Sequence, residues 1–231
     1  MGRLMRIEAL DGSAQFDAYC ATPDGTPRGA IVVIQEIFGI NAGVRARCDR
    51  WAANGYLAVA PDLFWRFAPG VDLDPDRPED FKQALQLLQQ FETDPAVADI
   101  EAVIRVARKD SGGRVGVVGY CLGGKLAYLA ATRTDTDASV GYYGGGIHEM
   151  LSESHAIARP LMLHFAEADH FIDAEARAAV HAALDGNGHV VIHEYPGVDH
   201  GFATETGKRR DEAAANLADE RAAAFFAEHV G

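Results

Sequence analysis

The sequence predicts an α/β fold, a mostly parallel, doubly wound sheet with helices on both faces. Short apolar runs such as Ala30–Ile34 and Leu161–Phe165 alternate with helical segments from residue 30 onward. Such runs are typical of strands covered on both faces, and their alternation with helices is typical of parallel βαβ units. Because 231 residues can bury a core of their own and no repeat or linker divides them, we expect a single domain over residues 1–231.

The elements are predicted in a regular order. The strand at Ala30–Ile34 is followed by a helix over Val44–Asn54, which stops at Gly55, and by a strand over Tyr56–Ala60. The rest of the chain continues the alternation. The segments are a helix at Asp99–Lys109, a strand at Arg114–Val118, a helix at Lys125–Thr132, strands at Ser139–Tyr143 and Leu161–Phe165, a helix at Ala174–Leu184, a strand at Val190–Tyr195 and a helix at Asp211–His229.

Residues 65–93 interrupt this alternation. Prolines, a glycine and acidic residues fill positions 65–80, and Phe81, Leu85 and Leu88 then recur at roughly helical spacing. One interpretation is a cap over an active site, because long loops in compact domains are often functional. The other is an ordinary connection with an amphipathic helix packed on the core. We predict a possible cap excursion at 65–93.

Charge and composition limit the kinds of partner and the cellular compartment that we expect for this protein. The net charge of −13 opposes binding to nucleic acids and to anionic membranes. No apolar run approaches the ~20 residues of a membrane span, and the N-terminus has no apolar signal core. Three cysteines are few and odd in number, which favours a reducing compartment. We expect a cytoplasmic protein that acts on a small molecule, without a cofactor, as a monomer, with oligomers left open.

The strongest local signal is Gly119-Tyr120-Cys121-Leu122-Gly123, between a predicted strand and a predicted helix. This is the context of a nucleophile elbow, with cysteine in place of serine. The turn would put the sulfur at a helix N-terminus, where a thiolate is favoured, and the N–H of Leu122 would face the developing oxyanion. The alternatives are a glycine-rich turn with an inert, buried cysteine and a dinucleotide-binding loop, whose glycine spacing is absent.

A nucleophile needs a base and an orienting acid, which in this architecture follow it along the chain. Asp169 lies in the turn after the strand Leu161–Phe165, and His200 lies in the loop after the last strand. Asp173 competes for the role of the acid but suits a helix N-cap better, and Glu167 is the third choice.

Histidine and aspartate could also bind a metal, as in Asp169-His170 and Asp199-His200. The usual zinc motifs are absent, so no metal site is predicted. His164 and His193 lie inside predicted strands and are interpreted as structural, whereas His170 adjoins the proposed acid.

The order of five motifs suggests a family. The motifs are Gln35-Glu36-Ile37-Phe38-Gly39, Gly119-Tyr120-Cys121-Leu122-Gly123-Gly124, Gly141-Tyr142-Tyr143-Gly144, Asp169-His170-Phe171 and His200-Gly201-Phe202. With them, residues 5 to 230 resemble the dienelactone hydrolases (carboxymethylenebutenolidases) of the α/β-hydrolase fold.

The resemblance implies an ester or lactone hydrolase with a triad of Cys121, His200 and Asp169 and a thioester intermediate. It also implies that Glu36 takes the thiol proton when substrate binds, and that the N–H of Ile37 completes an oxyanion hole with Leu122. The alternative function is a small-molecule-binding protein of this fold that has lost its reaction.

The substrate pocket departs from the family pattern. The family holds a substrate carboxylate with two arginines, whose places are taken here by Thr204 and Phe81. The expected pocket is therefore more apolar than in the family, and a preference for neutral substrates follows. Arg66, Arg77 and Lys82 are the cations that could replace the missing arginines. The residues expected to form this pocket are Phe38, Phe81, Leu85, Leu88, Tyr143, Gly201 and Thr204.

Overall fold

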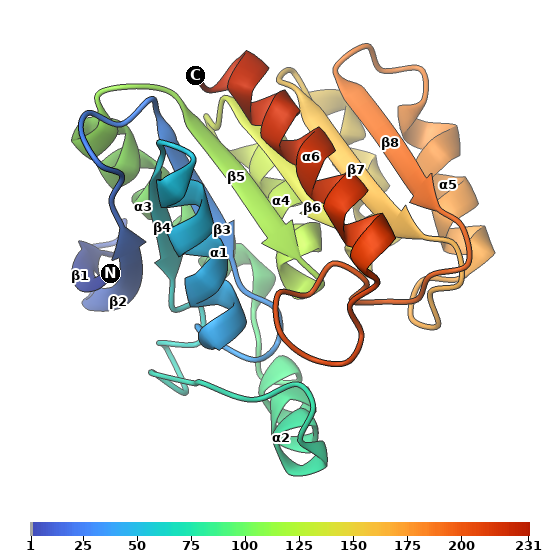
Figure 1. Cartoon of the computed structure of the whole chain (residues 1–231), viewed down its shortest axis with the longest axis horizontal. Coiled ribbons are helices and arrows are strands. Elements are labelled where there is room, and N and C mark those ends of the chain that lie inside the picture. The colour runs from blue at the N-terminus through green and yellow to red at the C-terminus, as the bar shows by residue number, and fades with distance from the viewer. Residues whose placement is uncertain (1) are drawn as a thin grey trace.

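The computed structural model describes residues 2–231, in which one eight-stranded sheet lies between two layers of helices (Figure 1). The strand order is β1-β2-β4-β3-β5-β6-β7-β8. Strand β2 is antiparallel to both of its neighbours, and the strands from β4 to β8 are parallel. The bounds are β1 Arg3–Glu8, β2 Gln15–Ala21, β3 Ala30–Ile34, β4 Leu57–Pro61, β5 Val115–Tyr120, β6 Ala138–Tyr142, β7 Leu161–Ala166 and β8 Val190–Tyr195.

Helices cover both faces of the sheet. Helices α1 and α6 lie on the face toward the viewer in Figure 1, and α3, α4 and α5 lie behind it. No helix within residues 2–231 is long and apolar enough to cross a membrane. The bounds are α1 Ala42–Ala53, α2 Pro78–Leu88, α3 Thr93–Ser111, α4 Leu122–Arg133, the 3₁₀ helix η1 Ile147–Ala156, α5 Ala174–Leu184 and α6 Glu212–His229.

The predicted alternation from residue 30 onward is confirmed. Strands β3, β4 and β5 are fully buried, as their apolar runs predicted. The prediction missed β1 and β2, whose exposed residues interrupt the apolar ones, and it missed η1. Helix α3 begins at Thr93, earlier than the predicted Asp99, because Ala96 and Val97 also face the core.

The turn between β5 and α4 is as tight as the elbow motif predicted. Cys121 takes φ 55° and ψ −115°, a region that residues other than glycine rarely enter. A Cβ at Gly119 would lie 1.9 Å from the carbonyl oxygen of Gly123, and one at Gly123 would lie 2.6 Å from that of Ile34. Since neither position has room for a side chain, the two glycines let the helix start directly against the sheet.

Residues 65–93 leave the sheet and run along its edge. Strands β5 and β8 point toward this edge, and α2 lies beyond it (Figure 1). The excursion is tied to the loop after β3, since Leu73 donates its N–H to the carbonyl oxygen of Phe38 at 3.0 Å. Asn41, the N-cap of α1, donates to the carbonyl oxygen of Leu73 at 3.1 Å. Whether this segment moves as a cap stays a prediction.

Candidate active site

Cys121 is the thiol that reaches the surface at this edge. It lies at the end of β5, and its backbone N–H donates to the carbonyl oxygen of Tyr142 at 3.0 Å. Its side chain is partly exposed, whereas Cys20 and Cys48 are buried. Burial raises the pKa of both buried thiols. A reagent or substrate in the cavity described below can therefore meet Cys121 and neither of the other two cysteines.

His200 and Asp169 form a buried pair, although they are far apart in the sequence. Asp169 follows β7, His200 follows β8, and Nδ1 of His200 lies 2.9 Å from Oδ2 of Asp169. The other carboxylate oxygen of Asp169 accepts the N–H groups of Phe171 at 2.8 Å and Ile172 at 3.1 Å. Both oxygens of Asp169 are thus used, which holds the imidazole in one orientation.

Asp173 and Glu167, the two other candidates for the acid that orients His200, do not lie beside it. Asp173 is the N-cap of α5, and its carboxylate accepts the N–H of Ala176 at 2.8 Å. Glu167 is exposed to solvent. Of the three acids weighed in the sequence, Asp169 alone pairs with His200 in the structure.

The surroundings of His200 leave one ring nitrogen free. Aromatic edges flank the imidazole, with ring centroids at 5.0 Å for Tyr143 and 4.9 Å for Phe171. Within residues 2–231, Nε2 is buried and has no hydrogen-bond partner. Burial by itself would lower the pKa of His200, but Cys121 and Asp169 outweigh it and raise this pKa to about 10. His200 is therefore set to hold a proton opposite the sulfur.

A cavity of about 360 Å³ lies in front of this group. Its lining includes Cys121, His200 and Glu36 together with Ile37 and Leu122, the two residues whose N–H groups are the predicted oxyanion donors. Leu122 is the first residue of α4, so its N–H has no partner inside the helix. The lining residues are Glu36, Ile37, Phe38, Phe81, Leu85, Leu88, Cys121, Leu122, Lys125, Gly145, Gly146, His148, Glu149, Phe171, His200 and Arg209.

Three predicted pocket residues lie outside this lining. Tyr143 is completely buried behind His200, because its ring packs between His200 and Phe202. Gly201 and Thr204 line a separate small hollow beside Glu36 and Phe38. The chain turns after His200, with the N–H of Thr204 donating to the carbonyl oxygen of Gly201, and this turn carries both residues away from the cavity.

Glu36 lies where the fold brings it close to the thiol. It directly follows β3, next to the elbow, and its carboxylate receives no hydrogen bond from any residue that the structure describes. Burial raises the pKa of Tyr143 well above its usual value, and the nearby Glu36 carboxylate raises it further, as does Cys121. Glu36, Cys121 and the Tyr143 hydroxyl thus share one corner of the site.

The cations that line the cavity were not predicted from the sequence. Arg209 and Lys125 line it, and the Arg209 guanidinium carbon lies 5.1 Å from the ring centroid of Phe81. Within the described chain Arg209 forms no ion pair. The predicted substitutes lie elsewhere, since Arg66 pairs with Asp99, the exposed Arg77 pairs with Glu79, and Lys82 is outside the lining. None of the three predicted substitutes lines the cavity, and Arg209 was not predicted, because the return of the loop that carries it cannot be read from spacing. That the pocket is more apolar than in the family stays a prediction.

The other histidines near the site have local partners. Nδ1 of His164 lies 2.8 Å from the Tyr195 hydroxyl, and the ring of His193 stacks on that of His164. His170 is exposed and pairs with Asp199 at 2.8 Å. Across residues 2–231, no three His, Cys, Asp or Glu side chains gather closely enough to hold a metal ion.

The strand order, the elbow after β5 and the partners after β7 and β8 define an α/β hydrolase. A family model described as "Dienelactone hydrolase family" matches residues 16–230, and the chain belongs to this family.

Relatives of this chain align with it along almost their whole length. A candidate carboxymethylenebutenolidase from Azospirillum brasilense is 44% identical, with 96% of each chain covered. The carboxymethylenebutenolidase of Pseudomonas putida is 40% identical over 96% of this chain and 94% of its own. A solved structure of a candidate dienelactone hydrolase from Klebsiella pneumoniae subsp. pneumoniae MGH 78578 superposes with a TM-score of 0.87 at 26% identity, with 99% of each chain covered. The chain is therefore a hydrolase, and the alternative of a binding protein without activity loses its support.

The pKa of His200 should depend on Cys121. In Cys121→Ala the first of the causes that raise this pKa is gone while burial still lowers it, so the pKa should fall below about 10. Proton NMR of the imidazole, assigned with His200→Gln, measures it. Cys48→Ala is the control and should leave the pKa unchanged. An unaltered His200 pKa in Cys121→Ala would contradict the proximity of the two groups.

Because a raised pKa means that the folded state binds the proton more tightly, protonated His200 stabilises the fold below about pH 6.5, and this contribution is lost as the pH rises toward 10.

Proposed function

We propose that the protein hydrolyses a carboxylic ester or lactone through Cys121, His200 and Asp169, with a thioester acyl-enzyme as the intermediate. The observation that carries this proposal is the position of Cys121, held in a strained turn on a cavity that His200 also lines. The raised pKa of His200 supports its imidazolium form as the acid that protonates the leaving group. The activities in the relatives' names agree with an ester or lactone as the substrate class.

In the acylation step the sulfur of Cys121 attacks the substrate carbonyl carbon. The electron pair moves onto the carbonyl oxygen, and the N–H groups of Leu122 and Ile37 stabilise the resulting oxyanion. Both residues line the cavity beside the sulfur. The carbon–oxygen bond then breaks, and the leaving alkoxide takes the proton from Nε2 of His200. For a lactone, the leaving alcohol stays attached to the acyl group.

Deacylation returns the enzyme to its starting state. Neutral His200 removes a proton from water, the hydroxide attacks the thioester carbon, and the Cys121 thiolate leaves again. Asp169 holds the tautomer of His200 that presents Nε2 to water, and it stabilises the imidazolium. Glu36 is the group assigned to receive the Cys121 proton when substrate binds and to return it to the thiolate after deacylation. Its unpaired carboxylate in the same corner supports this role.

Loss of the nucleophile should abolish turnover. Cys121→Ala should lower kcat by about 10⁴-fold or more, as losses of a triad member typically do. A panel of aryl esters and lactones measures the rates, and accumulation of a thioester can be followed by mass spectrometry. Cys20→Ala and Cys48→Ala are the matched controls and should keep full activity, since both thiols are buried away from the cavity. Full activity in Cys121→Ala would end the proposal.

The acid can be identified by a pair of asparagine variants. Asp169→Asn should lower kcat strongly while the fold is kept, because the amide cannot hold the same imidazole tautomer. Asp173→Asn keeps an oxygen that can cap α5 and should leave kcat within about twofold. Steady-state kinetics together with circular dichroism measure both effects. If Asp173→Asn were the damaging change, the acid would be assigned to the wrong residue.

Arg209 changes the expectation for the substrate. The expected preference for neutral substrates followed from the absence of the family's two arginines, whereas Arg209 lies on the cavity without an ion-pair partner among the described residues. Arg209→Met should raise KM for a carboxylate-bearing lactone by about tenfold or more and leave its neutral analogue unaffected, because a charge-assisted hydrogen bond contributes about 1.5–3 kcal/mol.

The neighbouring Arg210, which pairs with Glu212, supplies the control Arg210→Met. Equal losses for the charged and the neutral lactone would show that Arg209 does not select the charge of the substrate.

A further inference from the structure

Arg47 is a buried cation that no acid of the described chain contacts as an ion pair. It lies on α1 and is only 3% exposed. Burial of a charge without a carboxylate partner is costly, so such a residue destabilises the fold unless its other contacts compensate. Burial also opposes its charge, but Tyr120, Tyr143, Asp219 and Glu205 together raise the pKa of Arg47. The guanidinium is therefore charged in the interior.

Its contacts join the strand end before Cys121 to the turn after His200. Nη2 donates a hydrogen bond to the carbonyl oxygen of Ala203, and the guanidinium carbon lies 3.5 Å from the ring centroid of Tyr120. Tyr120 directly precedes Cys121, and Ala203 lies in the turn that starts at His200. A planar guanidinium can stack on a ring and donate in its own plane at the same time, which lysine cannot do.

The helix that carries Arg47 adds a third part. Helix α1 begins directly after the loop of Glu36 and Ile37, and its N-cap is Asn41. One side chain thus connects the helix behind the first loop, the strand end that bears the nucleophile and the turn that bears the base. The second terminal nitrogen, Nη1, is buried without any hydrogen-bond partner within residues 2–231. Its contacts therefore leave one donor unsatisfied, which is unfavourable for stability.

We propose that Arg47 is a positioning residue that holds the His200 turn against the nucleophile elbow. A shift of about 1 Å between the sulfur and the base is enough to lower the rate of such a reaction by about a hundredfold. Arg47 contributes to turnover in this way without contact to the substrate, because it is absent from the cavity lining. The consequence for turnover rests on the proposed function, whereas the effect on the reactivity of Cys121 does not.

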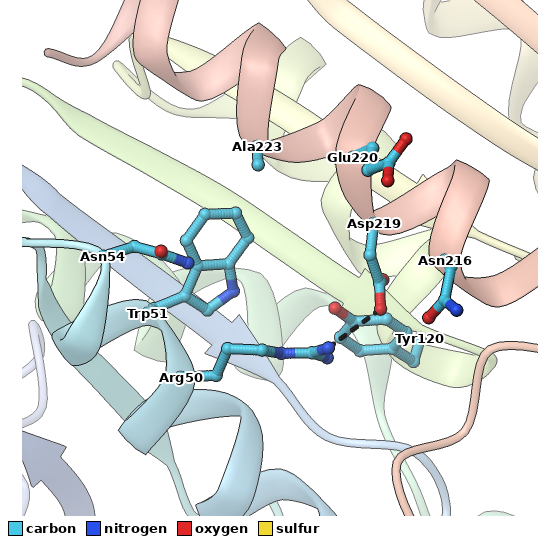
Figure 2. A pocket seen from close by; sticks show the side chains of 8 residues that line it. All are labelled: Arg50, Trp51, Asn54, Tyr120, Asn216, Asp219, Glu220 and Ala223. Carbon is cyan, nitrogen blue, oxygen red and sulfur yellow. Dashed lines mark hydrogen bonds and ion pairs between the residues drawn. The ribbon is translucent and has the colours of Figure 1, made fainter. Parts of the chain in front are cut away.

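Arg50 provides a matched comparison one turn later on α1. It pairs with Glu205 and, at 3.0 Å, with Asp219. The pair with Asp219 lies in a groove of about 280 Å³ between α1 and α6 (Figure 2). Arg50 therefore also ties α1 to the segment after His200. However, its side chain is 38% exposed, and ion pairs of this kind add little to stability. The guanidinium of Arg47 stacks on the ring of Tyr120, and within the described residues Arg50 makes no such stacking contact with Tyr120.

The experiment compares Arg47→Met, Arg47→Lys and Arg50→Met in the full chain. Arg47→Met should lower kcat for an ester that the wild type hydrolyses by about tenfold or more, with KM within about twofold. The rate at which iodoacetamide alkylates Cys121 at pH 7 should fall by about threefold or more, because a displaced base no longer favours the thiolate. The midpoint of urea unfolding should stay unchanged or rise, since an unpaired buried charge has been replaced by an apolar side chain of similar size.

The two other variants decide between positioning and simple tethering. Arg47→Lys keeps the charge and a donor and should restore part of kcat, whereas Arg50→Met should keep kcat and alkylation at wild-type values. Wild-type kcat and alkylation in Arg47→Met would overturn the proposal. Equal losses in Arg47→Met and Arg50→Met, or a loss of activity that follows a lower unfolding midpoint, would also overturn it. If the wild type hydrolysed no ester while Arg47→Met still slowed alkylation, the proposed function would fail and the positioning role would stand.

Discussion

The close contact between the start of α4 and the ends of β3 and β5 is the constraint on which the site depends. It forces Cys121 into a backbone conformation with positive φ and leaves no room for a side chain at Gly119 or Gly123. Such strain persists only where the surrounding structure determines it. Here the strain has a direct effect on chemistry, since it lifts the thiol out of the sheet and into the cavity at a helix N-terminus, where negative charge is favoured.

The remaining functional groups come from loops at the same edge of the sheet, where parallel strands deliver them. Asp169 follows β7 and His200 follows β8, and each is fixed by contacts of its own turn. Arg47 adds a contact from α1, a helix whose residues do not line the cavity. The site is thus built from separate loops that side-chain contacts join.

Electrostatics divides the cavity into two regions. Cys121, His200 and Glu36 form the end to which we assign the proton transfers, and the burial of His200 strengthens its interaction with neighbouring charges. Arg209 lies over the ring of Phe81, beside the hydrophobic wall that α2 supplies. Arg209 is the reason why we propose that a substrate with an apolar body and one anionic group could bind here, in contrast to the neutral substrates expected from the sequence. The overall charge of −13 still opposes the approach of an anion, so the local cation acts against the field of the whole protein.

Local patterns determined much of this protein before any fold was known. Apolar runs such as Ala30–Ile34 predicted the buried strands, and the glycines around Cys121 predicted the elbow, because both depend on residues adjacent in the chain. Chain order also picked out Asp169 and His200, which the structure then brought into contact. Strands β1 and β2 were missed because one face of them meets solvent and breaks the apolar pattern.

The tertiary structure alone decided which side chains line the cavity and which lie behind it. It moved Tyr143, Gly201 and Thr204 out of the expected pocket and brought Arg209 and Lys125 in. It also placed Arg47 between the elbow and the base, although nothing in the helix around it signals such a role. The physical reason is the same in each case. The direction of a side chain at the end of a long loop depends on where the loop returns, and that is set by packing between segments far apart in the chain.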